Sequence, residues 1–185
     1  MTNNYKILAI IGEAGTGKDT IMKGVLKKNP NIHEIVSCTT RPPREKEKDG
    51  VNYHFLTHEE FTNKILNNEM LEATVFNDWC YGTSYDSLDA NKVNIGVFNP
   101  AGIEALMEHK NIFIVCYYVR AADKQRLLRQ LNREENPDVK EIIRRFSADN
   151  LDFSELQFHY NEIENNTLQD LDKNIEIINS ACLRL

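Results

Sequence analysis

A glycine-rich segment near the start of the chain has the residue types needed to hold the phosphates of a nucleotide. Residues 12–18 read Gly-Glu-Ala-Gly-Thr-Gly-Lys. The glycines permit backbone geometry that other residues resist, so that successive N–H groups can point at phosphate oxygens. Lys18 adds a cation for the outer phosphates and for the charge that develops when a phosphoryl group is transferred. The segment therefore indicates the binding of a nucleoside triphosphate.

The flanking sequence supplies the elements that must position this loop. Residues 5–11 form an apolar run typical of a strand buried on both faces, and residues 19–28 have helical composition. A strand, a glycine-rich turn and a helix, in this order, are the context of a P-loop, in which the helix N-terminus attracts phosphate. A turn that holds no phosphate is the alternative. The expected contacts with ATP are Glu13, Ala14, Gly15, Thr16, Gly17, Lys18, Asp19 and Thr20.

The residue after the lysine departs from the usual P-loop pattern, which places Ser or Thr there to reach Mg²⁺. In this chain Asp19 comes first and Thr20 second. A carboxylate oxygen can hold this hard cation directly or through water. We therefore expect Asp19 and Thr20 to contact the Mg²⁺ ion that accompanies ATP.

A second group of residues suits the dianionic phosphate of a nucleoside monophosphate. Arg41 and Arg44 provide forked guanidinium donors, which match phosphate oxygens in bidentate geometry. Tyr53 and Tyr81 provide O–H donors that can be aimed at the same group. An acceptor phosphate is therefore expected among these four side chains, although arginines beside prolines can also form a solvated turn.

Three further residues match the hydrogen-bonding edge of guanine. The base presents N1–H and a 2-amino group as donors, for which the Glu72 carboxylate is a natural partner. The hydroxyls of Ser37 and Thr83 can serve the O6 acceptor. A buried polar site of this type rejects other bases more strongly than an apolar pocket does.

The order of these residues resembles that of guanylate kinases along nearly the whole chain. The family shows Ser-x-Thr-Thr-Arg-x-Pro-Arg, then a Gly-x-x-Tyr-x-Phe segment, then Glu after an aliphatic residue, then Tyr-Gly. This chain has all four in order, at residues 37–44, 50–55, 71–72 and 81–82. The resemblance implies that Arg41, Arg44, Tyr53 and Tyr81 hold the phosphate of GMP, and that Ser37, Glu72 and Thr83 read the base.

The same resemblance implies two arginines that close over the transferring phosphoryl group. Arg133 matches the first of them; Arg145 matches the second, with Arg144 as a rival. The expected catalytic residues are thus Lys18, Arg41, Arg133 and Arg145. In contrast, Arg126 and Arg129 are expected on a solvated face of a helix spanning residues 122–133.

One segment departs from the family pattern. Guanylate kinases usually carry Asp-x-Asp at the end of the strand that here spans residues 93–98, but this chain has Val97 and Asn99. Asn99 can make a hydrogen bond but lacks the charge. With this change, the preferred acceptor nucleotide and the rate of phosphoryl transfer can differ from those usual in the family.

The rest of the chain alternates between strand and helix patterns, which predicts an α/β fold with a parallel central sheet and helices on both faces. The resemblance implies the three-layer P-loop NTPase fold as a single domain. A core is expected at residues 1–36, 85–133 and 146–185, a monophosphate-binding insertion at about 37–84 and a lid at about 134–145, beginning with a polar loop. Further strands are predicted at 112–119 and 161–164, and helices at 58–67, 100–109 and 168–178.

Composition sets the remaining expectations. The net charge of -6 argues against a general nucleic-acid binder, and no apolar run has the length of a membrane span. The four cysteines lie far apart, which fits a reducing compartment. We therefore expect a cytoplasmic protein whose partners are small nucleotides, without nucleic acid or membrane; the oligomeric state stays open.

The sequence as a whole predicts a kinase that transfers a phosphoryl group from ATP to GMP or dGMP. Two alternatives stay open. The first is a kinase of another nucleoside or deoxynucleoside monophosphate. The second is a non-catalytic guanylate-kinase-like binding module, against which Lys18 and the intact glycines of the P-loop argue.

Overall fold

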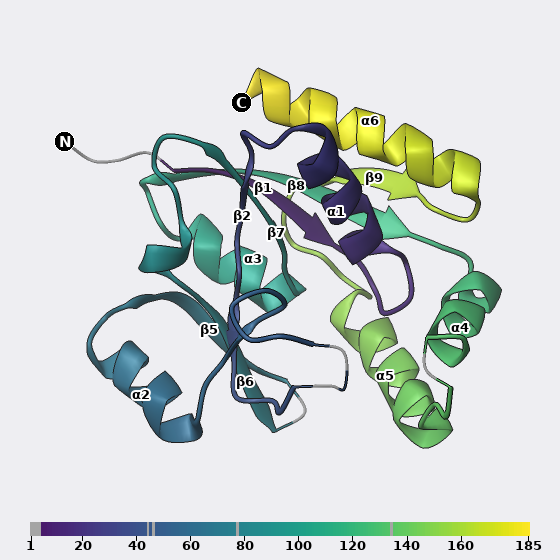
Figure 1. Ribbon diagram of the computed structural model, residues 1–185, viewed down its shortest axis with the longest axis horizontal. Coiled ribbons are helices and arrows are strands. Elements are labelled where there is room, and N and C mark those ends of the chain that lie inside the picture. Colours follow the sequence, from purple (N-terminus) through teal and green to yellow (C-terminus); the bar gives the residue numbers. More distant parts are fainter. Residues whose placement is uncertain (1–4, 44, 46, 77, 134) are drawn as a thin grey trace.

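A five-stranded parallel sheet forms the centre of the molecule (Figure 1). The computed structural model describes residues 5–43, 45, 47–76, 78–133 and 135–185. The strand order is β2-β7-β1-β8-β9, and every neighbouring pair is parallel. The bounds are β1 (Tyr5–Ile11), β2 (His33–Glu34), β7 (Val93–Val97), β8 (Ile112–Arg120) and β9 (Asn161–Glu164). The predicted α/β fold with a parallel sheet is therefore confirmed.

Helices cover both faces of this sheet because its central strand is apolar on both sides. Leu8 and Ile10 of β1 point into a cluster with α1 (Lys18–Lys28) and α6 (Leu168–Arg184). The alternate residues, among them Ile7 and Ala9, point into a second cluster with α3 (Pro100–Met107). Beyond β8 and β9, α4 (Asp123–Leu131) and α5 (Val139–Asp152) pack against each other (Figure 1).

A second, mixed sheet lies within the residues that the sequence assigns to an insertion. Its strand order is β4-β3-β6-β5, and the bounds are β3 (Cys38–Thr39), β4 (His54–Phe55), β5 (Met70–Phe76) and β6 (Trp79–Ser84). The helix α2 (His58–Leu66) packs on β5 and β6, and the 3₁₀ turn η1 (Tyr85–Ser87) leads back to β7. The division into core, insertion and lid stays a prediction.

Side-chain caps fix where several helices begin. Thr57 forms a reciprocal capping box with Glu60 at the start of α2. Asn99 accepts from the Gly102 amide at the start of α3, where Pro100 occupies the first helical position. Asp138 accepts from the Glu141 amide and starts α5.

Two helices differ from the sequence-based expectation. The residues assigned to the lid pass into α5, a helix that was not predicted and that extends to Asp152. The last helix continues to Arg184, six residues beyond the predicted end at Ile178. Within the described residues, no helix combines the length and apolar character that crossing a membrane would require.

Candidate active site

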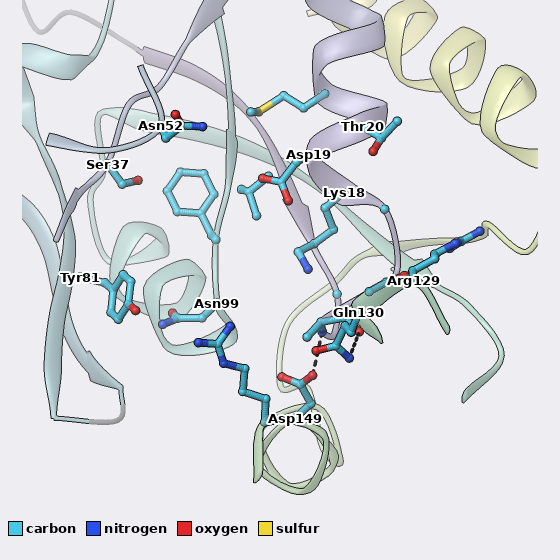
Figure 2. Close-up of a pocket in the computed structure, with 18 of the residues that line it drawn as sticks. Lys18, Asp19, Thr20, Ser37, Asn52, Tyr81, Asn99, Arg129, Gln130 and Asp149 are labelled. Carbon is cyan, nitrogen blue, oxygen red and sulfur yellow. Dashed lines mark hydrogen bonds between the residues drawn. The ribbon is translucent and has the colours of Figure 1, made fainter. Parts of the chain in front are cut away.

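A cavity of about 1260 Å³ brings the two predicted binding regions together (Figure 2). The P-loop contributes Gly12, Ala14, Gly15, Gly17, Lys18, Asp19 and Thr20 to its lining. The residues predicted for the acceptor contribute Ser37, Arg41, Tyr53, Glu72 and Tyr81. The helices α4 and α5 and the loop between them contribute Arg129, Gln130, Arg133, Arg144, Arg145 and Asp149, among others. Donor and acceptor residues therefore share one space.

The P-loop has the backbone conformation that its glycines were expected to allow. Gly15 and Gly17 have φ angles of 83° and 94°, a region that side chains disfavour. A Cβ atom on Gly15 would lie 2.5 Å from the carbonyl oxygen of Arg126, so the loop packs directly against α4. Only glycine fits this approach.

Lys18 folds back over the loop that it follows. Its ammonium group donates to the carbonyl of Glu13 at 2.9 Å, and the Thr16 hydroxyl donates to the same oxygen. Burial lowers the pKa of Lys18, while the nearby carboxylates of Asp19 and Asp149 oppose this shift. The ammonium group is thus held against the P-loop, with the acidic side chains of Asp19, Asp149 and Glu13 nearby.

The prediction for Arg126 and Arg129 was wrong. Arg126 is only 2% exposed and donates from Nε to the carbonyl of Ala14 at 3.2 Å. Arg129 donates from Nη1 to the carbonyls of Gly15 and Thr16, both at 3.2 Å. The helix presents arginines to the P-loop because the loop turns carbonyl groups outward there, and these need donors.

Asp149 of α5 is a site residue that sequence reasoning missed. Its Oδ2 atom accepts a hydrogen bond from the Ala14 amide at 2.7 Å and one from Arg126 Nη2 at 3.2 Å. The phenyl ring of Phe146, from the same helix, lies under the Arg126 guanidinium at 4.3 Å. No sequence signal could have identified this aspartate, because its partner in the P-loop is 135 positions away.

Glu13 faces away from the cavity. Its Oε1 atom accepts from the hydroxyl of Tyr118 at 2.9 Å and lies 3.8 Å from Arg126 Nη1. Its Oε2 atom is buried and has no hydrogen-bond partner among the described residues. The predicted contact of Glu13 with ATP can therefore involve only the backbone.

On the acceptor side, Arg41 is already paired with a carboxylate. Its Nη2 atom donates to both oxygens of Glu47, at 3.0 and 2.8 Å. The guanidinium lies 5.6 Å from the ring of Tyr53, which meets the ring of Tyr81 edge-on at 6.1 Å. These three predicted phosphate ligands form one cluster, whereas Arg44 lies outside the described residues.

Glu72 is the buried carboxylate of the cavity. Its side chain is 8% exposed, and burial raises its pKa to about 7. Ser37 lines the same cavity, and the fully buried Thr83 follows on the neighbouring strand β6, paired with Glu72 in the register of the sheet. Hydrogen bonding to Thr83 stabilises the charged form of Glu72 and so opposes this rise in its pKa.

The two arginines considered for the second lid position, Arg144 and Arg145, both bind the same carboxylate. Arg144 donates from Nε to Glu141 at 2.7 Å, and Arg145 donates from Nε to the other oxygen of the same carboxylate at 2.6 Å. These bonds lower the pKa of Glu141 to about 2. Arg133, Arg144 and Arg145 all line the cavity, so their proposed roles, and the choice between the last two, stay predictions.

The segment without the usual acids has a structural role. Val97 and Asn99 both line the cavity. Asn99 Oδ1 accepts from the Gly102 amide at 2.7 Å, and its Nδ2 donates to the Thr74 hydroxyl at 3.0 Å. Asn99 therefore ties α3 to the second sheet.

The metal prediction rests on Asp19 and Thr20. No cluster of three or more His, Cys, Asp or Glu side chains suited to a metal occurs in the described part of the chain. Both residues line the cavity next to Lys18 (Figure 2). A magnesium ion that takes most of its ligands from phosphates and water needs only one or two protein oxygens, so this pair fits such an ion.

Comparison with known proteins adds an independent finding. The family model of guanylate kinase matches residues 4–181. The chain is 33% identical to a guanylate kinase of Clostridium perfringens (strain SM101) over 184 residues, which cover 95% of this chain and 83% of the relative. It is 32% identical to a guanylate kinase of Helicobacter pylori (strain J99) over 193 aligned positions, which cover 100% and 90%. The crystal structure of guanylate kinase from Anaplasma phagocytophilum matches with a TM-score of 0.69 at 23% identity, covering 97% of this chain and 87% of that one, which supports the fold.

Proposed function

Since the chain belongs to the guanylate kinase family, we propose that it transfers the γ-phosphoryl group of ATP to the phosphate of GMP or dGMP, releasing ADP and GDP or dGDP. The observation that carries this proposal is the shared cavity. The P-loop and the predicted acceptor residues line one space, as direct transfer between two nucleotides requires.

The donor side acts through backbone donors and one cation. The N–H groups of the loop and of the α1 N-terminus would bind the phosphates of ATP, and Lys18 would contact the outer ones. Bound Mg²⁺ neutralises phosphate charge during such a transfer. Asp19 and Thr20 are the residues that would hold it.

The acceptor side acts through the cluster of Arg41, Tyr53 and Tyr81, with Arg44 added by family resemblance. A phosphate dianion entering this cluster would replace Glu47 as the partner of Arg41. The exchange keeps the buried guanidinium paired throughout. It also fixes the acceptor oxygen at a defined place relative to the P-loop.

The base would be read by Glu72 with Ser37 and Thr83. A carboxylate accepts from both donors of guanine, whereas adenine and cytosine offer a different pattern. Because Glu72 is buried, a base that leaves it unpaired carries the full desolvation cost.

Catalysis would need positioning and charge neutralisation and no dedicated base, because the acceptor phosphate is already nucleophilic. Lys18 and Arg41 flank the two phosphates. Arg133 and Arg145 would complete the cationic surroundings of the transferred group when the lid closes.

A kinase of another nucleoside monophosphate is the second candidate. The Asp19-Thr20 ending of the P-loop and the neutral Val97 and Asn99 favour it, because both are departures from the family pattern. The buried Glu72 opposes it. A binding module without activity has less support, because the phosphate loop and its lysine are in place.

The deciding experiment is steady-state release of ADP with Mg-ATP and a panel of GMP, dGMP, AMP, CMP, UMP and dTMP. Turnover confined to GMP and dGMP is expected. Turnover led by another nucleotide would overturn the guanine assignment and keep the kinase, and no turnover with any acceptor would favour the binding module.

A further inference from the structure

The carboxylate of Asp149 accepts a hydrogen bond from a backbone amide of the P-loop. Figure 2 shows it pointing from α5 toward the loop, on the side of the cavity where Gln130 also contacts the loop. The bond from the Ala14 amide is short, at 2.7 Å, as expected for a charged acceptor. A carboxylate of the chain itself therefore binds to the P-loop, where a phosphate of ATP is expected.

The position of this anion would match that of an outer phosphate of ATP. Ala14 precedes the stretch from Gly15 to Lys18 that opens α1, where inner phosphates bind. The Asp149 carboxylate is also an electrostatic neighbour of Lys18, the residue that reaches the outer phosphates. Asp149 and the terminal phosphate of ATP would thus compete for the same two partners.

The loss of Asp149 would not leave its cationic partner unpaired. Arg126 also contacts Asp123 at 3.1 Å and lies 3.8 Å from Oε1 of Glu13. The second Glu13 oxygen is buried and has no partner among the described residues. A small movement of Arg126 toward Glu13 would satisfy both groups, so two arrangements of this network are available.

We propose that Asp149 is an internal substitute for the terminal phosphate of ATP, which ties α5 to the P-loop until a triphosphate displaces it. The inference rests on the proposed use of the P-loop for ATP. It makes Asp149 a positioning residue that sets the relative affinity for ATP and ADP. ADP lacks the competing phosphate and leaves the contact in place, whereas ATP releases α5, which carries Arg144 and Arg145.

The test compares nucleotide affinities by isothermal titration calorimetry with Mg²⁺. The ligands are ADP and the β,γ-imido analogue of ATP, which cannot be transferred. Replacing Asp149 with Ala removes the competitor, so the analogue should bind about tenfold more tightly while ADP changes by less than about twofold. Asp149→Asn removes the charge but keeps an acceptor for the Ala14 amide, so its gain should be smaller.

Glu155→Gln is the matched control, because it removes one negative charge just beyond α5 at an exposed position. It should leave both affinities unchanged. If the Ala variant fails to fold, the Asn variant decides by the same comparison. Unchanged or weaker binding of the analogue, with ADP binding retained, overturns the inference alone; a wild-type chain that binds neither nucleotide overturns it together with the proposed function.

Discussion

Glu72 stands directly against Gly102: a Cβ atom placed on Gly102 would lie 3.3 Å from Glu72 Oε2. The same atom would lie 3.0 Å from the Oδ1 of Asn99, which caps α3. The buried carboxylate is therefore confined between its own strand β5 and the first turn of α3. A group that is held in this way can present its oxygens to a base without a loss of side-chain entropy on binding.

Glu72→Gln tests the guanine assignment. Because an amide can accept from only one of the two guanine donors, the KM for GMP should rise about tenfold or more, and the KM for ATP by less than about twofold. Steady-state kinetics with each substrate varied in turn measures both. Glu59→Gln, an exposed change on α2, is the control. Equal losses for the two substrates would contradict the assignment.

The pH dependence of acceptor binding follows from the same group. Its pKa of about 7 means that a proton must leave this carboxyl before both oxygens can accept from guanine, so the KM for GMP should rise as pH falls below 7. The phosphate of GMP itself titrates near pH 6. The pH profile of the KM for GMP measured with Glu72→Gln must therefore be subtracted from that of the wild type. A step near pH 7 that persists in this variant would assign the titration to another group.

The stability linked to Glu72 should change in the same pH window. Its folded pKa of about 7 lies above the ordinary value of 4.5, so the folded state holds more protons between these pH values. The contribution of this carboxyl to the free energy of unfolding is therefore greatest below pH 4.5 and is lost as the pH rises toward 7. Urea unfolding of the wild type and of Glu72→Gln across this range measures it.

Lys18→Ala should abolish transfer and preserve the fold. The ammonium group donates to a loop carbonyl, and it is the cation expected at the transferred group. Loss of one such group typically lowers kcat by about 100-fold or more. Circular dichroism should show an unchanged thermal transition. Lys27→Ala, an exposed change on the same helix, should keep full activity.

Arg126→Met tests the contact of α4 with the P-loop. The change leaves the carboxylates of Glu13 and Asp149 buried without their cation, which should destabilise the protein by about 3–5 kcal/mol. Arg120→Met removes an exposed pair with Glu162 and should cost about 1 kcal/mol or less. Urea denaturation compares the two. A similar small effect for both would show that Arg126 has no special role in stability.

The sequence predicted those helices and strands that a local pattern of residues encodes. The strand β1 has the predicted bounds, Tyr5–Ile11, because an apolar run followed by a glycine-rich loop is distinctive. The two-residue strands β3 and β4 are too short for any periodicity. The helix α5 follows a polar loop and carries the adjacent Arg144 and Arg145 at its middle, a composition that favoured a lid loop over a packed helix.

The parts of the site that escaped prediction depend on contacts between distant segments. Arg126 and Asp149 resemble ordinary surface charges in the sequence, and their burial arises only when α4 and α5 fold onto the P-loop. Glu72 was predicted from its residue type and order, but its raised pKa follows from the surroundings that the fold provides.

The pairing of Arg41 with Glu47 affects how strongly simple inorganic anions can bind at this site. Sulfate or free phosphate that approaches Arg41 must displace a carboxylate already bound through both oxygens. A lone ion would gain only those contacts, whereas a nucleoside monophosphate would add the contacts proposed between its base and Glu72. Inorganic anions would therefore compete only weakly with a nucleoside monophosphate for binding at Arg41.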